Sequence, residues 1–87
     1  MTLVSKEEIF EELKKLIVEV NEGRMKEILL TTTLQECIAD SLEYMNLIIK
    51  VEIFFSIEFE DEDIISENYE NVDAFVVQVQ KMINTNN

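Results

Sequence analysis

The sequence has no histidine, no proline and no tryptophan, and it has one glycine and one cysteine. Without histidine, the chain lacks the commonest general base and the commonest neutral metal ligand. A single cysteine, Cys37, excludes a disulfide within the chain, which fits a reducing compartment. No stretch approaches the roughly 20 apolar residues of a membrane span, and the N-terminus has no apolar run of the signal-peptide type. We therefore expect a cytoplasmic protein with no membrane partner.

The acidic charge is concentrated in one part of the chain. Nineteen acidic and seven basic side chains give a net charge of −12. Residues 36–73 contain twelve acids and one base, Lys50, so this segment has a net charge of −11. Such a field repels nucleic acids and anionic membranes and attracts basic protein surfaces, but acids also keep small proteins soluble. On charge alone, a basic partner and mere solubility both remain open, and a nucleic-acid partner is not expected.

Apolar periodicity predicts helices over most of the chain. With 87 residues and 47% apolar content, the chain is long enough for one domain with a modest core. Ser5 and Glu8 form a capping-box pattern before an apolar stripe, and similar stripes follow candidate caps at Asp40 or Ser41 and near Asn71. The expected fold is all-α, a small four-helix bundle of three longer helices and one short one. The expected domain spans 1–87, with helices over about 5–20, 41–55, 61–67 and 71–83 and a long loop over 21–40.

Motifs for catalysis and metal binding are missing from the sequence. Ser41 follows Asp40, but a serine and an acid without a relay base do not make a hydrolase triad. Asp61–Asp63 lacks the alternating acids and central glycine of a calcium loop, and it is predicted to be an acidic first helical turn. Cys37 is expected to be a small buried hydrophobe. We therefore expect neither an enzyme nor a metal site.

Ser41 is the residue that the pattern singles out. It follows the long loop and opens an apolar helix, where backbone N–H groups and the helix dipole favour a phosphate ester. Serine is also a favoured N-cap residue, and taken alone Ser41 is better explained as a cap.

The residues around Ser41 reverse that preference, because they resemble the acyl and peptidyl carrier protein family. The run Ala39-Asp40-Ser41-Leu42-Glu43 matches the D-S-L motif at the start of that family's second helix. The tripeptide alone is a weak signal, whereas the ordered set that follows it is specific, and the resemblance covers the whole chain. That set comprises Leu47, Val51, Phe55, Ile57, Phe59 and Asp61-Glu62-Asp63-Ile64.

The resemblance implies a non-catalytic, monomeric carrier. Ser41, flanked by Asp40 and Leu42, would be esterified by the 4′-phosphopantetheine arm of coenzyme A, whose thiol holds acyl or aminoacyl groups as thioesters. The implied partners are a phosphopantetheinyl transferase and ligases (acyl- or adenylate-forming), ketosynthases or acyltransferases with basic docking surfaces. The residues expected to dock them are Glu43, Met45, Asn46, Ile49, Glu52 and Ile53.

The chain departs from the family pattern at several positions. Cys37 and Ile38 stand where the family usually has Leu-Gly before the D-S-L region. Asn46, Ile53 and Phe54 occupy positions that are often acidic in fatty-acid carriers. The more apolar helix predicts a specialised polyketide- or nonribosomal-peptide-type pathway, with fatty acid synthesis as the alternative.

Two alternatives remain at this stage. Met45, Ile49 and Ile53 have the ordinary spacing of core residues, but one or two of them at the surface would contact a partner or the acyl chain.

The rival function is an acidic interaction protein, such as an adaptor or a DNA mimic, with no covalent arm. In that case Ser41 is dispensable.

Overall fold

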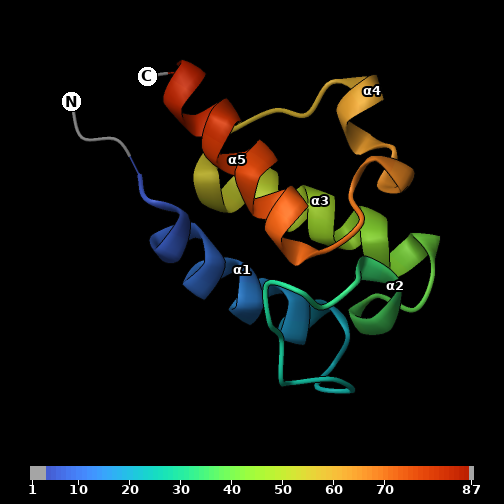
Figure 1. Cartoon of the computed structure of the whole chain (residues 1–87). Coiled ribbons are helices and arrows are strands. Elements are labelled where there is room, and N and C mark those ends of the chain that lie inside the picture. Colours follow the sequence, from blue (N-terminus) through green and yellow to red (C-terminus); the bar gives the residue numbers. More distant parts are fainter. Residues whose placement is uncertain (1–3, 87) are drawn as a thin grey trace.

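The computed structural model describes residues 4–86, and it is built of helices joined by irregular segments (Figure 1). No β-strand occurs in this part of the chain, where Thr33 and Asn71 form only an isolated bridge. The all-α prediction is therefore confirmed for the described residues. The helices are α1 (Lys6–Val20), α2 (Leu34–Cys37), α3 (Ser41–Phe55), α4 (Asp61–Ile64) and α5 (Val72–Asn86), and a 3₁₀ turn spans Ser66–Asn68.

The helices α1 and α3 follow the predicted bounds closely, and α5 continues three residues beyond its predicted end at 83. The predicted loop over 21–40 and the predicted helix over 61–67 are partly wrong. Thr33 and Glu36 cap each other reciprocally and start α2 inside the expected loop. This T-x-x-E pattern stands in the sequence, behind threonines that disfavour helix. The second difference arises at Ile65, whose extended backbone (φ −62°, ψ 112°) ends α4 before the 3₁₀ turn begins.

The long helices start and stop at local signals. Ser5 and Glu8 form the capping box of α1, as predicted. Asn21 is the C-cap of α1, and Gly23 follows with a left-handed φ of 76°, a conformation that glycine adopts without steric cost. The Asn71 side chain accepts a hydrogen bond from the Ala74 N–H at the start of α5.

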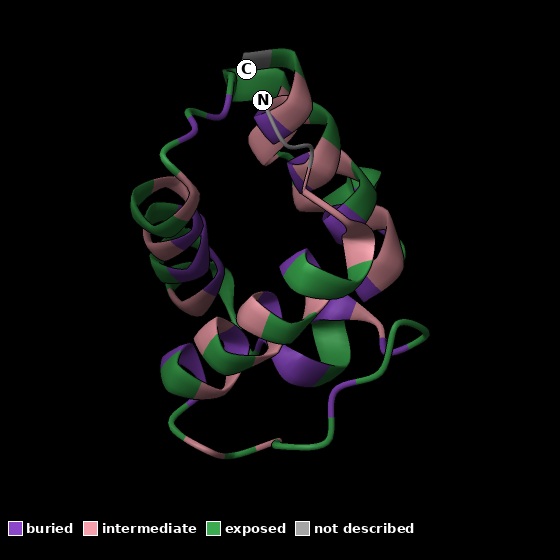
Figure 2. Ribbon diagram, turned by 90° about the vertical axis from the view of Figure 1, so that its left-hand side faces the viewer, coloured by how far each residue is buried: buried purple, intermediate pink, exposed green. Residues whose placement is uncertain are grey.

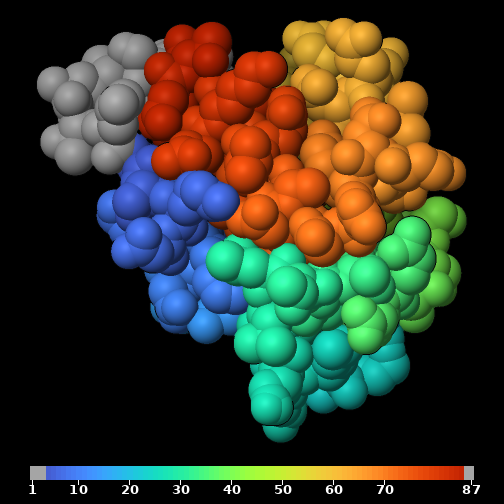
Figure 3. Space-filling model, viewed as in Figure 1, coloured from blue at the N-terminus to red at the C-terminus, as the bar shows by residue number. Residues whose placement is uncertain are grey.

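One apolar core joins the long helices. The sides of the helices that face one another carry the buried residues (Figure 2), and α1 packs against both α3 and α5. Phe75 of α5 is fully buried, with its ring 5.8 Å from that of Phe59 and 5.1 Å from that of Tyr69. Figure 3 shows α5 lying between α1 on one side and the segment that contains α4 on the other.

The segment between α3 and α4 is a connecting loop, as predicted. Ile57 and Phe59 alternate with polar residues and are buried, yet they pair with no strand in the described chain. The helix α4 contributes no buried residue of its own. Two tyrosines hold it in place, because the Tyr44 hydroxyl donates to the Ile64 carbonyl and the Tyr69 hydroxyl donates to the Asp63 carbonyl, both at 2.5 Å. None of the helices described is both long and apolar enough to cross a membrane.

Candidate functional site

Ser41 is the first residue of α3, and the residue that caps this helix is Asp40. The Asp40 backbone is extended, and its carboxylate accepts a hydrogen bond of 2.9 Å from the Glu43 N–H. Asp40 therefore fills the N-cap position, and the explanation of Ser41 as the cap is wrong. Ser41 is exposed, and its hydroxyl makes no hydrogen bond within residues 4–86.

The N-terminus of α3 offers backbone donors beside this serine. The first N–H groups of any helix have no partner inside the helix. The N–H groups of Ser41 and Leu42 find no acceptor elsewhere in the described chain, whereas those of Glu43 and Tyr44 bond to Asp40. A 15-residue helix also places a partial positive charge at this end. The surroundings of Ser41 thus suit an attached phosphate group.

A clamp formed by Asn21, Arg24 and Glu43 fixes the backbone that leads into Ser41. The Arg24 guanidinium donates to the Cys37 carbonyl at 3.2 Å and to Glu43 Oε1 at 3.0 Å. The same Glu43 oxygen accepts from the Ala39 N–H at 2.9 Å. Asn21, which is only 3% exposed, donates to the Cys37 carbonyl at 3.0 Å. These bonds connect the segment after α1 to the backbone before and after Ser41, which we call the Ser41 turn.

We expect Glu43→Ala to loosen this turn, because it removes the acceptor shared by Arg24 and Ala39. Both side chains are partly exposed, so the loss in unfolding free energy should stay near 1 kcal/mol. Amide hydrogen exchange of the Ala39 N–H should accelerate about fivefold, the factor that such a loss produces. Glu27→Ala, at an exposed position of the same loop, is the control. Equal Ala39 exchange rates in the two variants would contradict the clamp.

The backbone at Cys37 and Ile38 adopts a conformation that does not require glycine. Ile38 has φ −121° and ψ 118°, an ordinary extended conformation, and its side chain is buried. Cys37 is fully buried, as predicted, and burial raises the pKa of its thiol to about 11. Cys37 and Ile38 therefore both pack into the core, with only Ala39 between them and the Asp40 cap.

Cys37 should be inert in the folded protein. The ordinary thiol pKa is near 9.0, so the shift to about 11 lowers the thiolate fraction at pH 7.5 by about 100-fold. Burial blocks the reagent as well. A disulfide reagent such as dithionitrobenzoate should therefore react with Cys37 at least about 100-fold more slowly in the native protein than in the protein unfolded in concentrated urea. Comparable rates in the two conditions would show that Cys37 is accessible.

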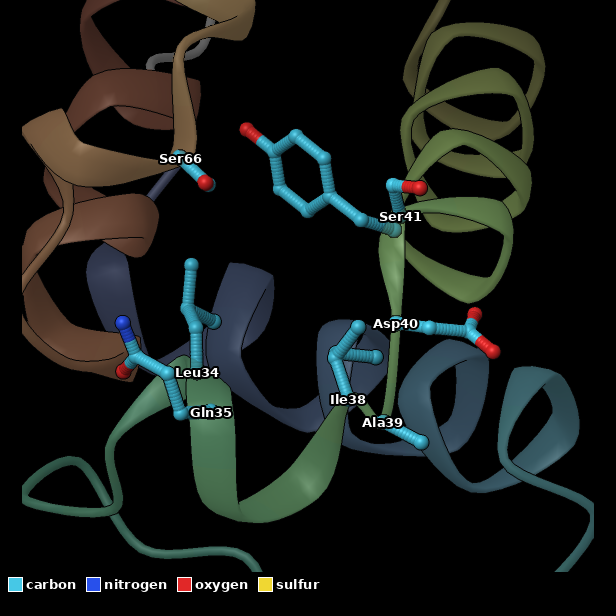
Figure 4. A pocket seen from close by; sticks show the side chains of 8 residues that line it. Leu34, Gln35, Ile38, Ala39, Asp40, Ser41 and Ser66 are labelled. Atoms are coloured by element: carbon cyan, nitrogen blue, oxygen red, sulfur yellow. The ribbon is translucent and has the colours of Figure 1, made fainter.

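A pocket of about 210 Å³ lies beside the Ser41 turn. Leu34 and Ile38 extend toward it, whereas the side chains of Asp40 and Ser41 point away from it (Figure 4). Ser41 is thus a rim residue, with its hydroxyl on the outside. The residues that line the pocket are Leu34, Gln35, Ile38, Ala39, Asp40, Ser41, Tyr44 and Ser66.

Tyr44 forms part of the pocket wall and is held by its hydrogen bond to Ile64. Burial raises the pKa of the Tyr44 phenol far above its usual value, and the neighbouring Tyr69 and Glu67 add to this effect. The phenol is therefore a neutral donor at every physiological pH. It cannot act as a base toward a ligand in the pocket.

Four apolar side chains form a ridge along the outer side of α3. We call Leu42, Met45, Ile49 and Ile53 the apolar ridge; they are 70, 40, 49 and 74% exposed. The interpretation of the last three as core residues is therefore wrong. At about 100° per residue, they lie opposite the buried side of α3, so the helix is apolar on both faces.

The polar residues predicted for docking have different surroundings. Asn46 is exposed. Glu43 belongs to the clamp, and Glu52 Oε2 accepts a hydrogen bond of 2.9 Å from the Phe59 N–H after α3. Both acids thus bind the protein's own backbone through one carboxylate oxygen.

Several residues near Ser41 escaped the sequence analysis. No functional role was predicted for Asn21, Arg24 or Ser66. Arg24 lies 19 residues before Glu43, its ion-pair partner. Ser66 reaches the pocket rim only because the chain turns back after α4. No local pattern marks such contacts. In the described part of the chain, no group of three or more Cys, Asp or Glu residues is arranged to hold a metal ion.

No protein-family model and no curated protein matches this sequence.

Proposed function

We propose that this chain is an acyl or peptidyl carrier protein whose Ser41 accepts the 4′-phosphopantetheine arm of coenzyme A. The observation that supports this most directly is the division of roles at the start of α3. Asp40 caps the helix, while Ser41 stands exposed at the first helical position with an outward hydroxyl. A serine that is not needed as a cap, beside unpaired helix N–H groups, suits a covalent phosphate ester.

The chemistry assigned to this chain is limited to one oxygen nucleophile. Ser41 Oγ would form a bond to the phosphorus of the 4′-phosphate, the bond from that phosphorus to the bridging oxygen would break, and 3′,5′-adenosine bisphosphate would leave. The serine proton passes to a base of the transferase. The N–H groups of Ser41 and Leu42 are the donors available to the phosphodiester. When bound, the arm supplies a thiol that carries acyl or aminoacyl groups as thioesters.

The clamp and the cap give Ser41 a fixed position for its partner enzymes. Arg24, Glu43 and Asn21 hold the preceding backbone, and Asp40 holds the first turn of α3. An enzyme that must reach one hydroxyl gains rate when that hydroxyl is already oriented. The carrier itself contributes no acid, base or metal in this proposal, and it is a substrate of other enzymes.

The apolar ridge supports docking along α3. Leu42 follows Ser41 directly and is 70% exposed, so a protein that binds at Ser41 also covers the start of the ridge. The net charge of −11 over residues 36–73 favours a partner with a basic surface. The contact surface on α3 is thus apolar and lies in an acidic protein. Such a surface suits partner enzymes that differ from those of a carrier whose helix is itself acidic. A specialised polyketide- or nonribosomal-peptide-type pathway is therefore part of the proposal.

The second candidate is an acidic interaction protein without a covalent arm. The ridge and the acidic charge favour it as well, because both suit a basic protein partner. The two candidates differ at Ser41. An adaptor binds equally well with alanine there, whereas a carrier loses its attachment point.

Intact mass measurement decides between them. The purified protein is incubated with coenzyme A and a broad-specificity phosphopantetheinyl transferase. A gain of one phosphopantetheine group supports the carrier. No gain in a folded protein, under conditions that load a known carrier, favours the interaction module.

A further inference from the structure

A hollow at the far end of α3 lies outside the site described so far. It has a volume of about 230 Å³ and lies between α1 and α3. We call it the α1–α3 hollow; its lining residues are Leu16, Lys50, Ile53 and Phe54. Ile53 is also the last residue of the apolar ridge. The ridge thus runs from the residue next to Ser41 to the edge of a pocket, over roughly 18 Å of helix.

The hollow presents apolar surface that the fold does not use. Ile53 is 74% and Phe54 is 51% exposed, although Phe54 contacts the ring of Phe55 at 4.9 Å. Leu16 from α1 closes the other side, so the hollow depends on the packing of two helices. Three apolar walls around a concave space suit one large apolar side chain.

The overall charge of the protein indicates the chemistry of the occupant. Lys50, the one base among residues 36–73, forms an ion pair with Glu19 of α1 at 2.5 Å. Its charge is therefore matched locally, so the hollow adds no unpaired positive charge to a protein whose net charge is −12. A complementary surface carries an apolar side chain with lysine or arginine around it.

A second copy of this chain fits the hollow poorly. Each copy carries a net charge of −12, so two copies repel each other. A stable interface buries about 800 Å² on each partner, far more than the four residues that line the hollow present. Surface of this size suits a transient contact with a basic protein.

We propose that the α1–α3 hollow is the second anchor point for the enzyme that modifies Ser41, and that it receives a large apolar side chain of that enzyme flanked by basic residues. This inference rests on the proposed carrier function. The enzyme spans α3, with its active site over Ser41 and its anchor in the hollow. Because the hollow is remote from the reacting oxygen, it contributes to binding and not to the chemical step.

The apolar part of the proposal is tested with the double variant Ile53→Gln/Phe54→Gln. The matched control is Leu29→Gln/Val77→Gln, at positions that are 61 and 45% exposed and do not line the hollow. Steady-state loading by the phosphopantetheinyl transferase should show KM raised about tenfold or more in the test variant and kcat within about twofold of wild type. Calorimetric titration with the transferase, without coenzyme A, should show the same loss of affinity. The control should match wild type in both measurements.

The charge part is tested by removing each member of the ion pair. Glu19→Gln leaves Lys50 unmatched against a basic partner, so the transferase Kd should rise about two- to fivefold. Lys50→Gln leaves Glu19 unmatched, and the Kd should fall by a similar factor. The opposite signs would indicate an acidic partner surface and would overturn the proposal.

The outcomes separate this inference from the carrier function itself. A wild-type protein that accepts no arm would refute the carrier function, while the titration would still show whether the hollow binds the transferase. Normal loading with equal KM and Kd in test and control variants would refute the hollow as an anchor. A concentration-dependent dimer in sedimentation velocity, lost in Ile53→Gln/Phe54→Gln, would assign the hollow to a second copy and would also refute it.

Discussion

Replacing Ser41 with alanine should abolish loading by a phosphopantetheinyl transferase completely, while the fold stays intact. Ser41 is exposed and forms no hydrogen bond within the described chain, and the cap of α3 is Asp40, so the substitution removes only the nucleophilic oxygen. We expect a change in unfolding free energy within about 0.5 kcal/mol. Intact mass after incubation with coenzyme A should show one added arm on the wild type and none on Ser41→Ala.

The matched control for this experiment is Ser66→Ala. Ser66 lines the same pocket from the opposite side, but it lies in the 3₁₀ turn rather than at the start of a long helix. It should load as the wild type does, because of these two serines only Ser41 lies at the N-terminus of a long helix. Tandem mass spectrometry of the loaded wild type should place the arm on Ser41. An arm on Ser66, or loading of Ser41→Ala, would contradict the assignment.

Phe75→Ala should have the largest effect on stability. Phe75 is fully buried and contacts the rings of Phe59 and Tyr69, and so joins α5 to the segments on both sides of α4. Truncation of a buried phenylalanine costs about 3–5 kcal/mol through lost burial and the cavity left behind. A domain of this length has a total stability of roughly 4–13 kcal/mol, so the variant should be close to unfolding at 25 °C.

Phe54→Ala provides the control with the same chemical change. Phe54 is 51% exposed at the α1–α3 hollow, where truncation leaves no internal cavity. Urea unfolding followed by far-UV circular dichroism should show a loss of about 3 kcal/mol or more for Phe75→Ala and less than about 1 kcal/mol for Phe54→Ala. Similar losses in the two variants would show that the core is not centred on Phe75.

Loading and stability are expected to depend on separate sets of residues. The nucleophile and the ridge lie on the outside of α3, whereas stability comes from its inner side, where Tyr44, Leu47 and Val51 pack into the core. A variant that fails to load can therefore be tested for folding independently. If folded Ser41→Ala fails to load, the missing hydroxyl is the cause and not a loss of the fold.

The sequence by itself determined the helices and the place of Ser41. Capping residues and 3.6-residue periodicity act within one or two turns, so they can be read from neighbouring residues. Ser5, Asp40 and Asn71 mark the starts of α1, α3 and α5 in this way. Where two local signals competed, as at the threonines before α2, the capping box prevailed and the predicted loop was wrong.

Only the tertiary structure decided which side of α3 faces outward. This helix is apolar around most of its circumference, so periodicity does not distinguish the side that packs on α1 and α5 from the side left to solvent. The packing buried Leu47 and Val51 and exposed Ile49 and Ile53. The clamp on Ser41 and the α1–α3 hollow likewise join residues far apart in the chain, and such contacts exist only after the helices have packed.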